Sequence, residues 1–91
     1  MNLRSVFGSS VRVKVLEHLL SNPQRLYSQS EISRQVGCSV SSAGRAVSAL
    51  QRLELVKVAH IPGQVKVIAL NSESPITTAL LRLREDLKSH P

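Results

Sequence analysis

The sequence predicts a mainly α-helical domain that carries a small antiparallel β-hairpin and an added C-terminal helix. Apolar residues recur at helical spacing in four separate stretches, each preceded by a serine that can cap a helix. Between the third and fourth stretches, residues 55–70 are rich in Val and Ile around a Pro-Gly pair, which is typical of two strands joined by a turn. A chain of 91 residues accommodates one such domain with a modest core.

Residues 11–20 form the first expected helix. Ser10 can cap it, and Asn22-Pro23 ends it because the residue before a proline disfavours helical geometry. Its apolar residues, which fall on one broad side, are Val11, Val15, Leu16, Leu19 and Leu20. Arg12 lies within the same arc. We therefore expect a structural role for Arg12, with its stem along the edge of the core and its charge at the surface.

The second expected helix has the sharpest start signal in the chain. Ser28 and Glu31 have the spacing of a capping box, in which each side chain bonds to the backbone N–H of the other residue. Tyr27 and Ile32 flank this box at the spacing of a hydrophobic staple. Gly37 is expected to end the helix in a left-handed conformation.

The third expected helix, residues 39–53, has two contrasting sides. Its apolar stripe, which Ala46 and Leu53 widen, is formed by Val40, Ala43, Val47 and Leu50. The opposite line is formed by Ser41, Arg45, Ser48 and Arg52. A solvated helix face usually mixes acids with bases, because such pairs support the helix. This line contains no acid, so it is either a face for an anionic partner or a plain solvated face rich in serine.

The remaining elements are a hairpin and a last helix. The strands are expected at residues 56–61 and 64–70, with Pro62-Gly63 in the centre of a type II turn. Two strands alone are marginal, so the hairpin must pack on the helices. Ser74-Pro75 opens the last helix. Its heptad-like positions are Ile76, Leu80, Leu83 and Leu87.

The charge of the chain points to an anionic partner. The formal net charge is +6, and residues 1–70 carry all of it, with nine Lys and Arg against three acids. Such a balance favours nucleic acid first and an anionic membrane surface second. No apolar run approaches the ~20 residues that a membrane-spanning helix needs. We therefore expect a soluble, cytoplasmic protein with no membrane partner.

Other classes of function lack the residues that they need. We find no nucleophile–base pair, glycine-rich phosphate loop or paired carboxylates, so we do not expect an enzyme. His18, His60 and His90 lie on different elements, and Cys38 is the single cysteine, expected in a turn. We therefore expect no metal and no cofactor. Phe7 and Tyr27 are both expected in the core, which disfavours a binder that stacks single-stranded bases on exposed aromatics.

Three helices followed by a hairpin, with the second and third joined by a short turn at a glycine, have the layout of a winged helix-turn-helix domain. The segment LEHLLSNPQRLYSQSEISRQVGCSVSSAGRAVSALQRLELVKV resembles prokaryotic regulators of the MarR and ArsR type. Its ordered motifs are SxxEIxxxxG, SxSxx and LxxLxLV. The flanks, FGSSVRVKVLEHLL and LNSESPITTALLRLRED, resemble a subset of these domains found alone or beside small nucleotidyltransferases. The expected fold is thus a three-helix core with a hairpin wing and an added C-terminal helix.

The resemblance implies a role for each part of the chain. Residues 39–53 would be the recognition helix, which enters the DNA major groove. The residues expected to read bases are Ser39, Ser41, Ser42, Arg45 and Ser48. The residues expected to contact the DNA backbone are Ser28, Ser30, Arg34, Arg52, Lys57, His60, Gln64 and Lys66. Residues 1–71 would form the DNA-binding domain, and residues 72–91 would form a dimerisation element.

The expected function is that of a sequence-specific double-stranded DNA-binding regulator, with repression as the expected outcome. It would act as a homodimer through Ile76, Leu80, Leu83 and Leu87, unless that helix instead folds back on its own domain. The alternative function is a protein-interaction module that docks a nucleotidyltransferase or a partner in the transcription machinery. Such a module should expose large apolar anchors on residues 38–53. The sequence identifies no effector, operator or regulated gene.

Overall fold

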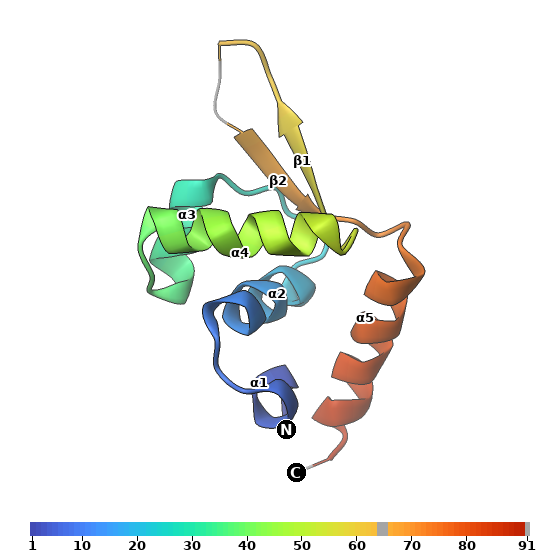
Figure 1. Cartoon of the computed structure of the whole chain (residues 1–91). Helices are drawn as coiled ribbons and strands as arrows, with labels where there is room; N and C mark the ends of the chain where they lie inside the picture. Colours follow the sequence, from blue (N-terminus) through green and yellow to red (C-terminus); the bar gives the residue numbers. More distant parts are fainter. Residues whose placement is uncertain (64–65, 91) are drawn as a thin grey trace.

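The computed structural model describes residues 1–63 and 66–90, and its architecture is mainly helical with a two-stranded antiparallel hairpin (Figure 1). In chain order the elements are α1 (Leu3–Phe7), α2 (Val11–Ser21), α3 (Gln29–Val36), α4 (Val40–Arg52), β1 (Val56–His60), β2 (Lys66–Leu70) and α5 (Pro75–Lys88). Helices α2, α3 and α4 pack together, the hairpin projects from them, and α5 runs back toward the N-terminus. The predicted winged-helix fold class is confirmed.

The core lies where α2, α3 and α4 meet. Val15, Leu19, Ile32 and Leu50 are each almost completely buried there, as helical spacing predicts. The apolar stripe of α4 is shorter than expected, since its buried members are Ala43, Ala46, Val47 and Leu50. Val40 and Leu53 are 47% and 49% exposed, so their expected place in this stripe is wrong. Both sit at helix ends, where the periodic face continues beyond the neighbouring helices.

Helix α1 was not expected from the sequence. Asn2 caps it by accepting a hydrogen bond from the Ser5 backbone N–H (3.0 Å), and the Ser5 hydroxyl lies 3.3 Å from the Asn2 N–H in return. Leu3 is fully buried, but Phe7 is 56% exposed, so the expectation that Phe7 belongs to the core is wrong. The core reaches only the first turn of this short helix, and Phe7 lies beyond it.

The capping box that opens α3 is confirmed. The Ser28 hydroxyl accepts from the Glu31 N–H, and the Glu31 carboxylate accepts from the Ser28 N–H, each at 3.1 Å. Gly37 ends the helix in the left-handed region, with φ 75°, and its N–H donates to the Ser33 carbonyl (3.0 Å). Tyr27 and Ile32 are both buried, as the staple requires.

Glu31 makes this cap sensitive to acid. The Ser28 N–H, with help from the Ser28 hydroxyl and Arg25, holds the pKa of the Glu31 carboxyl below its ordinary value. A lowered folded-state pKa gives stability that is present above the unfolded pKa and is lost as the pH falls through the folded pKa. We expect the difference in unfolding free energy between the wild type and Glu31→Gln to shrink toward acid pH. Urea unfolding followed by circular dichroism at several pH values measures it. Glu54→Gln is the control, and a difference that does not vary with pH would contradict the prediction.

The hairpin is tied to the loop between α2 and α3. Strands β1 and β2 pair in the register Val56↔Leu70 to His60↔Lys66. Tyr27 bridges to Ile68 through two backbone hydrogen bonds of 2.9 and 2.8 Å. Strand β1 ends at His60, one residue before the expected end at Ile61. The expected start of the second strand, Gln64 and Val65, lies outside the described residues. Gly63 has φ 78°, which fits the expected type II turn.

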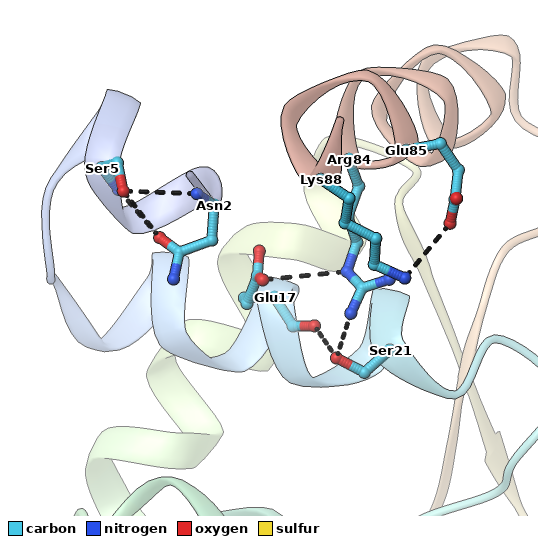
Figure 2. A network of polar contacts seen from close by, with 7 residues as sticks. All are labelled: Asn2, Ser5, Glu17, Ser21, Arg84, Glu85 and Lys88. Carbon is cyan, nitrogen blue, oxygen red and sulfur yellow. Dashed lines mark hydrogen bonds and ion pairs between the residues drawn. The ribbon is translucent and has the colours of Figure 1, made fainter. Parts of the chain in front are cut away.

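Helix α5 folds back on its own domain. Leu87 is only 8% exposed and belongs to the core, and Leu80 and Leu83 are half-buried against it. Arg84 reaches α2, where it pairs with Glu17 (3.7 Å) and donates to the Ser21 hydroxyl (3.0 Å), as Figure 2 shows. The four heptad-like residues therefore do not form one exposed seam. Of the four, Ile76 alone is exposed.

Candidate nucleic-acid interface

The outer side of α4 is the surface that the sequence singled out. Ser41, Arg45, Ser48 and Arg52 are all exposed, opposite the buried Ala43, Val47 and Leu50. The predicted exposure of this line is confirmed. Its members point away from the core because α4 packs on α2 and α3 through its small and branched apolar residues.

The start of α4 is held by a network of three side chains. Ser39 caps the helix by accepting from the Ser42 N–H (3.0 Å), and its hydroxyl donates to the Ser42 hydroxyl (2.9 Å). The Ser42 hydroxyl also accepts from Arg45 Nη2 (3.1 Å). The network orients the Arg45 guanidinium across the first turns of α4. Ser39 and Ser42 are thus engaged within the helix, whereas Ser41 and Ser48 make no side-chain hydrogen bond within residues 1–63 and 66–90.

A glycine in the middle of α4 allows α3 to approach closely. Gln29 donates from Nε2 to the Val40 carbonyl (2.9 Å), and its amide passes over Gly44. A Cβ at position 44 would lie 2.6 Å from Gln29 Nε2. Glycine inside a helix costs about 1 kcal/mol relative to alanine, so this contact offsets a real loss in helix propensity.

The two residues should therefore be energetically coupled. Gly44→Ala gains helix propensity but displaces the Gln29 amide, so we expect little net change in unfolding free energy in the wild-type background. In a Gln29→Ala background the same change should stabilise the domain by about 1 kcal/mol, because nothing then blocks the new methyl group. Urea unfolding of the four proteins in this double-mutant cycle measures the coupling. An equal effect of Gly44→Ala in both backgrounds would contradict it.

The inner face of the hairpin completes the surface. Lys66 and His60 pair across the strands, share this face and are both exposed. A hollow of about 560 Å³ lies between the hairpin and α4 and is lined by Arg12, Gln29, Ser41, Gly44, Arg45, Ser48, Ala49, Arg52 and Lys66. A second hollow, of about 200 Å³, is lined by Ser28, Gln29, Ser30 and Lys66. The structure thus brings together most of the residues that were assigned to DNA.

Two assigned residues lie elsewhere. Lys57 is on the opposite face of the hairpin because strand residues alternate, and it pairs with Glu73 (3.4 Å). Arg34 is exposed near the end of α3 and lines neither hollow. Gln64 lies outside the described residues. Lys57 and Arg34 are separated from the hollows beside α4.

Arg12 is the residue that sequence reasoning missed. It is exposed, which agrees with a charge at the surface, and it lines hollows on the α4 surface together with Arg45. The sequence pattern pointed only to a structural role for Arg12 and did not indicate this place beside α4. The first turn of α2 extends beyond the core and lies beside α4. The available signal was an arginine in an apolar arc, near the end of a helix.

The surface is electrostatically one-sided. Arg12, Arg45, Arg52 and Lys66 contribute positive charge, and no acidic residue lines either of the two hollows that include Lys66. The ion pairs found in the described part of the chain lie elsewhere, at Arg25–Glu31, Lys57–Glu73, Arg84–Glu17 and Lys88–Glu85. A concentration of unneutralised cations on one face attracts a polyanion.

Residues 1–63 and 66–90 contain neither a candidate membrane-spanning helix nor a candidate metal cluster. No helix there has the length and apolar character needed to cross a bilayer. No group of three His, Cys, Asp or Glu side chains is placed to hold a metal ion there.

The comparison with family models agrees with this geometry. Residues 13–59, which run from α2 through most of β1, match the model of the IclR helix-turn-helix domain. The chain belongs to the IclR helix-turn-helix family. It is therefore a helix-turn-helix domain of a transcription-regulator family, and the sequence-based prediction of a helix-turn-helix regulator is confirmed. The narrower MarR or ArsR assignment is not confirmed. Comparison with curated proteins finds no match.

Solved structures share the fold at low identity. A possible transcriptional regulator from Methanosarcina mazei is 19% identical, with a TM-score of 0.67 over 97% of this chain and 84% of that one. MepR, a transcription regulator of the Staphylococcus aureus multidrug efflux pump MepA, is 15% identical, with a TM-score of 0.68 over 96% and 65%. ZitR of Lactococcus lactis, as a C30S mutant in complex with DNA, is 15% identical, with a TM-score of 0.63 over 85% and 56%. This chain spans less than two thirds of MepR and of ZitR.

Proposed function

We propose that this protein is a cytoplasmic, sequence-specific regulator that binds double-stranded DNA and inserts α4 into the major groove. The observation that carries the proposal is the exposed line Ser41–Arg45–Ser48–Arg52, which has no acid and is bordered by Lys66. A helix fits the major groove, where arginine can donate two hydrogen bonds to the O6 and N7 of guanine. Membership of the IclR helix-turn-helix family supports DNA binding in general.

The contacts divide by position on the helix. Arg45, already oriented by Ser42, is the residue proposed to read guanine, and the hydroxyls of Ser41 and Ser48 face the same groove. Arg52 at the helix end and Lys66 on the hairpin would hold phosphates. Ser28 and Ser30, which line a hollow with Lys66, would do the same at the start of α3. Ser39 acts as the helix cap rather than as a free base contact.

We propose a homodimer as the working unit, with residues 1–71 binding DNA and residues 72–91 contributing to the dimer. Because Leu87 is buried within its own chain, the pairing surface would use the exposed apolar side chains of α1 and α5, namely Val6, Phe7 and Ile76. Two recognition helices would then enter successive major grooves about 34 Å apart on a two-fold symmetric site. Occupation of such a site would block transcription. Sedimentation equilibrium tests the dimer, and a monomer at all concentrations would contradict it.

A second candidate function, protein docking, has one observation in its favour. The outer face of the hairpin carries an apolar hollow of about 710 Å³, with Leu26 and Ile61 exposed at it. A nucleotidyltransferase or transcription-machinery partner would dock there and not on α4, whose exposed line has no large apolar anchor. Leu26→Ser would abolish docking and leave DNA binding unchanged.

Selection of bound sites from random duplex DNA tests the proposed function. We expect enrichment of one motif that repeats as two inverted half-sites, with centres about 10 base pairs apart or a multiple of that. A pool that shows no enrichment after repeated rounds would contradict sequence-specific binding. A single unrepeated half-site would support DNA binding but contradict the dimer.

A further inference from the structure

Arg12 lines a smaller hollow beside α4 in addition to the large one that it shares with Lys66. It is the second residue of α2, and its side chain lines a hollow of about 230 Å³ together with Val11, Ser42, Arg45 and Ala46. Two arginines from different helices thus line one hollow, which no acidic residue lines. Arg12 makes no ion pair or side-chain hydrogen bond within the described part of the chain. Its charge is therefore available to an anion.

This hollow lies to one side of the exposed face of α4. At 100° per residue, Ser41 and Ser48 lie at the centre of the exposed face, and Ser42 and Ala46, which border the Arg12 hollow, lie to one side. Gly44 lies to the other side, where Gln29 packs over it. Gln29 in turn shares a hollow with Lys66. Arg12 and Lys66 therefore border the exposed face of α4 from opposite sides.

We propose that Arg12 binds a backbone phosphate of the DNA strand that lies across the major groove from the strand held by Lys66. This inference rests on the proposed function of α4. The major groove is about 12 Å wide and is bordered by both backbones, so a helix within it has one strand on each side. Arginine suits the task because its guanidinium can pair with two phosphate oxygens. Arg45, held by Ser42, remains directed at the bases between the two strands.

The test compares single substitutions on the selected duplex. Arg12→Ala and Lys66→Ala should each weaken binding to all sequences alike. Each should lower the slope of log affinity against log salt by about 2 for the proposed dimer, because one phosphate contact is lost from each protomer. Arg12→Lys should keep the wild-type slope. Arg4→Ala is the matched control, because it removes an equal charge at an exposed position on α1 that lines a different hollow, and it should leave the slope unchanged.

Ethylation interference assigns the strands. Within one half-site, phosphates whose ethylation blocks binding of the wild type should no longer do so on one strand with Arg12→Ala, and on the other strand with Lys66→Ala. The two-fold symmetry of the dimer exchanges the strands in the second half-site. Loss on the same strand of one half-site for both variants, or an unchanged slope with Arg12→Ala while Lys66→Ala lowers it, would overturn this inference and leave the proposed function intact. A wild type that binds no duplex at any salt concentration would overturn the proposed function and this inference together. Circular dichroism unfolding confirms that each variant is folded.

Discussion

Replacing Arg45 with alanine is expected to remove discrimination at one base pair of the half-site, at a cost of about 1–3 kcal/mol for the preferred base. The reason is that Arg45 is exposed in the middle of α4 and is held in place by Ser42 at 3.1 Å. Arg45→Ala should therefore bind the preferred and the substituted sites with nearly equal affinity. Competition anisotropy with duplexes that differ at single base pairs measures this.

Two variants control this prediction. Lys66→Ala should weaken binding to every duplex alike and leave the ranking of sites unchanged, because phosphate contacts carry no sequence information. Ser42→Ala leaves the arginine in place but removes its anchor, so part of the discrimination should be lost. If Arg45→Ala weakened all duplexes equally and preserved their ranking, Arg45 would be a backbone contact and not a base-reading residue.

Replacing Leu50 with alanine is expected to destabilise the domain by about 2–5 kcal/mol. Leu50 is 1% exposed, and it lies on the side of α4 that packs into the core with α2 and α3. Truncation removes buried apolar surface and leaves a cavity that a close-packed core fills only in part. A domain of this size has a few kcal/mol of net stability, so much of the population should unfold.

The matched control lies three residues further along the chain. Leu53 is half exposed at the end of α4, so Leu53→Ala should change the unfolding free energy by no more than about 0.5 kcal/mol. Urea unfolding followed by circular dichroism compares the two variants. Equal destabilisation by Leu50→Ala and Leu53→Ala would contradict the assignment of the core.

The elements that were predicted well have strong local signals. The capping box of α3, the cap and the exposed line of α4 and the Pro-Gly turn each depend on residues that are close together in the sequence. Helix α1 escaped prediction because five residues are too few for a periodic pattern, and an Asn-x-x-Ser cap alone is a weak signal. Tertiary contact holds that helix through Leu3.

Periodicity predicts which side of a helix is apolar but not where the core ends. Val40, Leu53 and Arg12 all lie on the apolar side by spacing, yet each extends beyond the neighbouring elements. The heptad-like spacing of α5 is equally compatible with a second chain and with the chain's own domain. The burial of Leu87 shows that this one of the four heptad-like residues packs on the chain's own domain.

Some residues of the candidate site could be predicted from the spacing within one helix, and others could not. The exposed line of α4 followed from its own spacing, because all four residues lie on one helix. The contributions of Gln29 and Arg12 depend on how α2 and α3 pack against α4, and no local pattern contains that information. The sequence motifs are shared among winged-helix regulators, which explains why they predicted the class and not the IclR family.

Salt dependence of DNA binding tests the central claim most directly. Fluorescence anisotropy with the selected duplex should show a linear fall of log affinity with log salt. A dimer that neutralises ~6–10 phosphates should lose about 10³–10⁵ in affinity between 50 and 200 mM salt. Such a loss is the result expected if the face formed by Arg12, Arg45, Arg52 and Lys66 binds DNA, with Arg12, Arg52 and Lys66 on the backbone. An affinity that does not change across this range, or no binding at 50 mM salt, would contradict it.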